Sequence, residues 1–258
     1  MSLLKRIIFC LYYKEGYFYI SRNFRLQKVG NVEWLIENFG FGYTSNYVDE
    51  IIIILVKQEP TNSDYEDFFK NILKLRKNIF IPITLGGGIR NFKTSKKFFE
   101  NGADKILINT LAYKKKEIAE EIASSFGAQA ICVMIDYKEN DKKYELYSNC
   151  GTFLEDVGFN EHIKNLNSIS CGEIILNSID NDGNAEGINM KILNEISTKI
   201  NKPILIMGGA GKPEHLFQAL KSKKISGVIT ANLFNFLGDG LKFARSYALN
   251  NKIPLARF

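Results

Sequence analysis

Two glycine-rich segments are the first candidates for a functional site. They span residues 86–88 and 208–211, and Gly209 follows Gly87 by 122 residues. Each segment comes after a short apolar stretch and before a predicted helix, so its backbone N–H groups are free to bind an anion. The sequence therefore predicts two phosphate-binding loops in one chain. The alternative is a pair of tight strand-to-helix turns that bind no ligand.

A carboxylic acid and a phenol occupy matching positions near these loops. Asp136 opens the segment Asp-Tyr-Lys-Glu, and Tyr12 opens a similar Tyr-Tyr-Lys-Glu segment 124 residues earlier. A positioned carboxyl group can act as a general acid or base, whereas a phenol with a pKa near 10 is a poor base at neutral pH. Asp136 is thus the candidate catalytic group. Its simpler interpretation is a carboxylate that caps the following turn.

The same spacing recurs along the whole chain. Asn232 follows Asn109 by 123 residues, and Glu173 follows Glu50 by 123. A repeat that keeps its register in this way indicates two diverged copies of one unit. We place the copies at roughly 5–125 and 129–250, within a single domain that covers 1–258.

Short apolar runs alternate with amphipathic stretches, as expected for repeated βα units around a parallel sheet. Eight strand–helix pairs in about 250 residues are typical of a (β/α)8 TIM barrel, here with a twofold half-barrel repeat. An open doubly wound sheet alternates similarly, but a twofold repeat of four units closes more naturally into a ring. The predicted strands are 6–12, 50–56, 81–85, 105–109, 131–136, 173–177, 203–207 and 227–230, and the predicted helices are 32–39, 65–76, 94–101, 115–126, 154–167, 190–199, 214–221 and 236–250.

Composition narrows the class of protein. The chain has 258 residues, 45% of them hydrophobic, with only two histidines, a net charge of +6 and four cysteines without C-x-x-C spacing. We expect buried thiols, a solvated lysine-rich surface rather than a nucleic-acid site, and no metal or organic cofactor. The absence of a long apolar run predicts no membrane segment and no signal peptide, and hence a cytoplasmic protein.

A barrel places its chemistry at the carboxyl ends of the strands. The residues at or just past those ends are Tyr12, Leu55, Gly87, Asn109, Asp136, Asp182, Gly209 and Asn232. Four charged residues instead come just before strands, namely Arg6, Glu50, Lys105 and Glu173. We expect them to meet at the amino-terminal mouth of the barrel and to pair, because two cations and two anions neutralise one another beside an apolar core.

Several of these segments resemble the cyclase subunit of imidazole glycerol phosphate synthase. The resemblance runs from Lys5 to about Phe236, and the sister isomerase of histidine biosynthesis fits less well. Its strongest stretches are Lys5-Arg6-Ile7-Ile8-x-Cys10-Leu11, Gly86-Gly87-Gly88-Ile89, Gly102-Ala103-Asp104-Lys105-x-x-Ile108-Asn109-Thr110, Ser178-Ile179-Asp180-x-Asp182-Gly183 and Gly208-Gly209-Ala210-Gly211-Lys212-x-Glu214-His215.

This resemblance implies an enzyme that uses ammonia. A glutaminase partner would dock on the amino-terminal face, and ammonia would cross the barrel to a substrate with two phosphates. The four charged residues resemble the family's ammonia gate, although a ring that only stabilises the barrel would look the same. The implied phosphate and substrate contacts are Gly87, Asn109 and Thr110 on one side and Asp182, Gly183, Gly209, Ala231 and Asn232 on the other.

Three positions depart from the family pattern. The resemblance implies that ring closure uses two carboxylates, one from each half of the barrel, as general acid and base. Asp136 matches the second of them. Tyr12 occupies the position of the first, Leu55 that of an aspartate ending strand 2, and Ile20 that of a loop lysine. Loss of a positioned acid or base typically removes about 10²- to 10⁴-fold in rate. The bulkier Tyr12 should also intrude on the substrate space.

Three interpretations stay open. The first is a paralogue that docks a glutaminase and passes ammonia to a different acceptor; such relatives resemble subunits that accompany an ATP-dependent amidotransferase in making sugars for surface polysaccharides. The second is a working cyclase of histidine biosynthesis that tolerates Tyr12, with water or Asp182 transferring the missing proton. The third is a conduit or scaffold without turnover.

Overall fold

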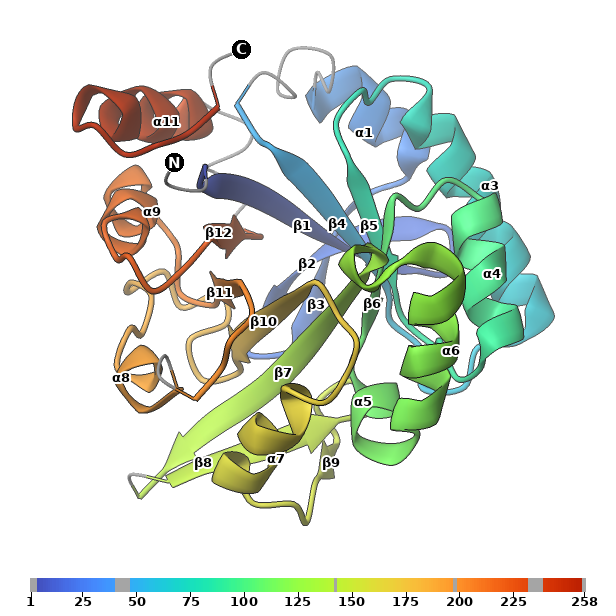
Figure 1. Cartoon of the computed structure of the whole chain (residues 1–258). Helices are drawn as coiled ribbons and strands as arrows, with labels where there is room; N and C mark the ends of the chain where they lie inside the picture. The colour runs from blue at the N-terminus through green and yellow to red at the C-terminus, as the bar shows by residue number, and fades with distance from the viewer. Residues whose placement is uncertain (1–3, 40–46, 142, 197–198, 232–238, 257–258) are drawn as a thin grey trace.

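The computed structural model describes residues 4–39, 47–141, 143–196, 199–231 and 239–256. Eight parallel strands form a closed barrel, because β10 pairs with β7 and so joins the two ends of the sheet. Helices surround these strands, as Figure 1 shows. The fold is therefore the predicted (β/α)8 barrel. Its strands are β1 (Arg6–Lys14), β4 (Glu50–Leu55), β5 (Ile83–Gly86), β6 (Lys105–Ile108), β7 (Ile131–Asn140), β10 (Glu173–Ser178), β11 (Ile204–Met207) and β12 (Gly227–Thr230).

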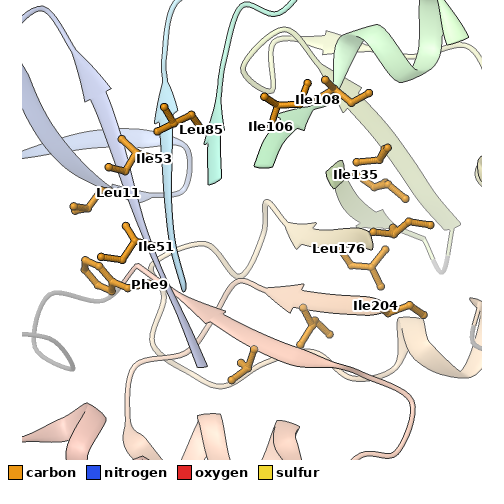
Figure 2. Packing of buried hydrophobic residues seen from close by; sticks show 14 of the residues in the cluster. Phe9, Leu11, Ile51, Ile53, Leu85, Ile106, Ile108, Ile135, Leu176 and Ile204 are labelled. Atoms are coloured by element: carbon orange, nitrogen blue, oxygen red, sulfur yellow. The ribbon is translucent and has the colours of Figure 1, made fainter. Parts of the chain in front are cut away.

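Alternate side chains of these strands separate into two apolar layers, as the two-residue period of a strand requires. One layer fills the barrel interior and includes Ile8, Cys10 and Ile52. The other lies between strands and helices, and Figure 2 shows part of it, including Leu11 and Ile53. The strands are consequently buried on both faces, which explains their nearly continuous apolar sequences.

The helices present apolar faces to the outer layer of this core. In α3 (Asn62–Arg76), a capping box between Thr61 and Asp64 fixes the start, while Phe68 and Ile72 are buried. The other helices are α1 (Val32–Phe39), α4 (Phe92–Glu100), α5 (Thr110–Lys114), α6 (Lys116–Phe126), α7 (Phe159–Leu166), α8 (Ile192–Ile196), α9 (Pro213–Leu220) and α11 (Gly240–Asn250).

Both halves begin with a strand that continues into an antiparallel hairpin, which the sequence analysis did not predict. β1 pairs with β2 (Tyr17–Arg22), which pairs with β3 (Arg25–Gly30). β7 pairs with β8 (Lys143–Ser148), which pairs with β9 (Phe153–Leu154). The far end of β7 and β8 projects from the barrel in Figure 1. This shared feature agrees with the twofold repeat.

Some predicted helices were wrong at their ends. The predicted helix 154–167 begins only at Phe159, because Leu154 pairs with Tyr147 of β8. The predicted helix 115–126 is α6, whereas the preceding helix α5 was not predicted. The predicted helix 190–199 contains α8, and its residues 197 and 198 lie outside the described residues, as does the part of 236–250 before residue 239. Within the described ranges, every helix is too short or too polar to cross a membrane.

Candidate functional site

The two glycine loops follow β5 and β11 and are built alike. Gly87 has φ +99° and Gly209 has φ +93°, values in the left-handed region that favours glycine. A Cβ atom at Gly87 would lie 2.0 Å from the carbonyl oxygen of Leu55, and one at Gly209 would lie 2.0 Å from that of Gly187. Any side chain at either position would therefore displace backbone.

A first cavity opens beside the loop of Gly87. It is lined by residues at the carboxyl ends of β1, β4, β6, β7 and β10. Thr110, Lys57 and Arg90 line it along with Gly87. The Arg90 guanidinium donates to the carbonyl of Gln58 at 2.9 Å. Lys57 is already paired with the Asp64 carboxylate at 2.7 Å, so the glycine backbone and Arg90 are the groups that suit this rim to an anion.

A second cavity opens beside the loop of Gly209. Its lining includes Asp182, Gly183 and Ala231, together with the cations Arg22 and Lys28. Ile20, the residue in place of a family lysine, also lines this cavity. Asn232 lies outside the described residues. The remaining substrate candidates are thus divided between two cavities, one beside each glycine loop.

Asp136 lies at the floor of the first cavity and is 6% exposed. The Asn177 amide donates to its Oδ1 at 2.7 Å, and the Asn109 amide donates to its Oδ2 at 3.1 Å. Burial raises the pKa of Asp136 to about 7, with Asp182 adding to the rise and the Asn177 hydrogen bond opposing it. A carboxyl group with this pKa can both accept and release a proton near neutral pH.

Tyr12 points into the barrel. Its ring belongs to the interior apolar layer, and the residue also lines the first cavity. Burial raises the pKa of Tyr12 well above its usual value, and the nearby Cys10, Asp182 and Asp136 add to the rise. The phenol therefore stays protonated at neutral pH and cannot serve as a base.

The Asp182 carboxylate is hydrogen-bonded to the β2–β3 hairpin. Its Oδ2 accepts hydrogen bonds from the Ser21 hydroxyl at 2.5 Å and from the Phe24 backbone N–H at 2.9 Å. Burial raises the pKa of Asp182, although both hydrogen bonds oppose the rise. This carboxylate therefore holds the hairpin tip against the loop after β10.

Leu55 differs in its orientation from the other candidates. Its side chain is buried in the outer layer between strands and helices, while its backbone lies against Gly87 and the first cavity. Leucine in place of the aspartate implied by the resemblance thus contributes an apolar side chain to the outer core, and it also alters the wall of the cavity.

The four predicted charges at the amino-terminal mouth form a closed ring, here called the amino-terminal ring. Arg6 pairs with Glu50 at 3.1 Å and also with Glu173. Lys105 pairs with Glu50 at 2.8 Å and with Glu173 at 3.2 Å. Burial acts to raise the pKa of Glu173, but Arg6 and Lys105 outweigh it and hold this pKa below its usual value. Glu173 is therefore ionised at neutral pH, and the nearby carboxylates raise the pKa values of Arg6 and Lys105.

Sequence reasoning missed three residues of the site, namely Asn177, Arg90 and Ser21. Asn177 ends a predicted strand and pairs in register with Asp136, so its position at a strand end was an available signal. Arg90 follows the first glycine loop directly. The role of Ser21 depends on the unpredicted hairpin. Within the described ranges, no group of three or more His, Cys, Asp or Glu residues could hold a metal ion.

Together, these features define a (β/α)8 barrel with an acid-bearing site between two glycine loops and a charged ring at the opposite end. The chain belongs to the histidine biosynthesis protein family, whose model matches residues 41–238. It is 38% identical over 98% of its length to the protein of Parasynechococcus marenigrum named "Putative imidazole glycerol phosphate synthase subunit hisF2", and covers 94% of that relative.

Relatives named imidazole glycerol phosphate synthase subunit HisF are also similar over nearly the whole chain. The protein of Hydrogenobaculum sp. is 35% identical over 97% of this chain and 98% of its own length. The protein of Chlorobium limicola is 31% identical over 98% of this chain and 99% of its own length. The chain is therefore a HisF-like cyclase-type subunit and a diverged member of its family.

Proposed function

We propose that this chain accepts ammonia within a glutamine amidotransferase complex and passes it to an acceptor other than the usual phosphoribosyl substrate. The observation that carries the proposal is the environment of Tyr12. A protonated phenol occupies the position that the resemblance gives to the first of the family's two carboxylates, and it packs into the barrel interior without a hydrogen bond to Asp136. Ring closure that needs two carboxylates would lose about 10²- to 10⁴-fold in rate.

The other parts of the site favour retained ammonia chemistry. The amino-terminal ring keeps all four charges paired, and the barrel above it is lined by apolar side chains such as Ile8, Leu107 and Ile175. An apolar interior favours neutral ammonia over the ammonium ion, because burying an unpaired charge is costly. We infer that the ring is the entry to this interior.

A glutaminase is the partner that we propose for the amino-terminal face. Phe80 precedes β5 on this face and is 87% exposed, and Leu4 precedes β1 and is 56% exposed. Large apolar side chains exposed around a mouth of paired charges favour a protein interface. The Phe80→Asp variant should bind a glutaminase encoded nearby more weakly, whereas Phe153→Asp, beyond the opposite end of the barrel, should not.

The acceptor that we propose is a phosphorylated sugar or a bisphosphorylated small molecule. Two glycine loops and the cations Arg90, Arg22 and Lys28 around the two cavities suit anionic groups. The final amidation would belong to surface-polysaccharide sugar synthesis, with an ATP-dependent sugar amidotransferase as a third component.

A second candidate function is the cyclase reaction of histidine biosynthesis. It is favoured by Asp136, whose pKa near 7 suits general acid or base catalysis, and by the names of the relatives. In this case water would perform the proton transfer that Tyr12 cannot.

Turnover of the usual phosphoribosyl substrate by the purified chain, with ammonium salt added, distinguishes the two candidate functions. We expect negligible turnover from the wild type and a gain from Tyr12→Asp. Tyr12→Phe is the matched control and should gain nothing, because it supplies no acid. Robust turnover by the wild type would overturn the proposed function and establish the cyclase. Absence of any glutaminase complex would instead leave a scaffold without turnover.

A further inference from the structure

The floor of the first cavity contains two amide side chains with a shared arrangement. Asn109 and Asn177 approach Asp136 from the neighbouring strands β6 and β10, and each directs its Nδ2 at one carboxylate oxygen. Asn109 Nδ2 also donates to the Met134 carbonyl at 3.1 Å. The carboxylate thereby fixes the orientation of both amides, since an amide oxygen turned toward it would be repelled.

This orientation leaves both amide oxygens without a donor. Asn109 Oδ1 and Asn177 Oδ1 are buried and have no hydrogen-bond partner among the described residues. Asn177 is 2% exposed, and both residues line the cavity. A buried acceptor left unsatisfied costs about 1–3 kcal/mol. Two such acceptors beside one carboxylate indicate a place where a ligand supplies the donors.

The charge of this floor restricts which ligand fits. Asp136 contributes a carboxylate and the two asparagines contribute carbonyl dipoles, while Asp182 adds negative potential. Phosphate and carboxylate groups bring only acceptors and would be repelled here, although they suit the rim formed by Arg90 and the glycine loop. A hydroxyl group brings one donor for two orphan acceptors. A nitrogen with several N–H bonds can donate to more than one of these acceptors at a time.

We propose that Asn109, Asp136 and Asn177 form an amide seat that binds an ammonium ion or a primary amino group. The seat gives the first cavity two distinct ends, an anion-binding rim and a floor that binds N–H donors. The identity of its natural occupant rests on the proposed function. The occupant would be ammonia, or the amino group of the acceptor, held directly above the apolar barrel interior. Binding by the seat itself is independent of any turnover.

The test is a carboxyl ¹³C NMR titration of Asp136 in the full-length chain. Ammonium chloride, methylammonium chloride and tetramethylammonium chloride are compared at equal ionic strength. A bound cation stabilises the carboxylate, so ammonium should lower the pKa of Asp136 in a saturable manner. Tetramethylammonium has no N–H donor and should not. A response to methylammonium assigns the seat to a substrate amine as well, whereas a response to ammonium alone assigns it to free ammonia.

Variants of the two asparagines supply the second arm. Asn109→Leu and Asn177→Leu keep the side-chain shape and should each weaken ammonium binding about tenfold or more, the effect of losing one hydrogen bond to a charged group. Asn140→Leu, at the exposed end of β7, should bind as the wild type does. Equal responses to ammonium and tetramethylammonium, or no response in the wild type, would overturn the seat whether or not the variants fold. Glutaminase binding is measured separately, so loss of the seat leaves the proposed function standing.

Discussion

Asp180 and Asp182 lie two residues apart on the loop after β10, and each accepts a backbone hydrogen bond from a different hairpin. Asp180 Oδ2 accepts from the Glu139 N–H at 2.8 Å, and Asp182 Oδ2 accepts from the Phe24 N–H at 2.9 Å. One loop thus connects the extended strands of both half-barrels. The hairpin tip held by Asp182 lies over the site, because Phe24 lines the first cavity and Ser21 lines both.

The first prediction concerns this connection. Asp182→Ala removes the acceptor for Ser21 and Phe24, so the tip of the β2–β3 hairpin should open more often. Amide hydrogen exchange at Phe24 should accelerate about tenfold or more, the equivalent of one charged hydrogen bond. Asp180→Ala is the matched control and should accelerate exchange at Glu139 only. Equal exchange at Phe24 in the wild type and in Asp182→Ala would show that the hairpin is held by other contacts.

The second prediction concerns pH. The pKa of Asp136 is raised from 3.8 to about 7, so the folded chain binds more protons at this site than the unfolded chain does between these values. Stability from this group is therefore greatest below about pH 4 and falls as the pH rises to 7, by at most on the order of 4 kcal/mol. Urea unfolding of the wild type and Asp136→Asn at both pH values isolates the effect. The difference in unfolding free energy between the two chains should change with pH in this direction, and a constant difference would contradict a raised pKa.

The barrel could be predicted from sequence because its strands are apolar on both faces and recur at a fixed spacing. The β2–β3 hairpin could not, because a segment such as residues 25–30 is polar and half exposed, and it is ordered by pairing with β2 rather than by its own pattern. Strand ends likewise located Asp136 and Asn109. The significance of Asn177 depends on the register that sets it opposite Asp136, which is a tertiary property.

The third prediction concerns the amino-terminal ring. Glu173→Gln leaves Arg6 and Lys105 sharing the single carboxylate of Glu50 in a partly buried site. Breaking a buried ion pair costs about 3–5 kcal/mol, and the partial exposure of Glu173 lowers the expected cost to about 2 kcal/mol. Urea unfolding measures the loss. Glu33→Gln breaks the exposed surface pair with Lys74 and should leave the unfolding midpoint unchanged. Similar behaviour of the two variants would mean that the ring contributes no more than a surface pair.

The fourth prediction separates backbone strain from collision in the glycine loops. Gly87→Ala and Gly209→Ala each combine a positive φ with a Cβ only 2.0 Å from a carbonyl oxygen, whereas Gly16→Ala has a φ of +80° and no atom within 4 Å. Gly16→Ala should therefore show only the left-handed strain of about 1–2 kcal/mol. The two loop variants should lose more stability, because backbone must move to admit the methyl group. They should also bind inorganic phosphate more weakly, whereas Gly16→Ala should bind it as the wild type does. Calorimetric unfolding and phosphate titration of the three variants check this order, and equal losses would place the cost of all three substitutions in φ alone.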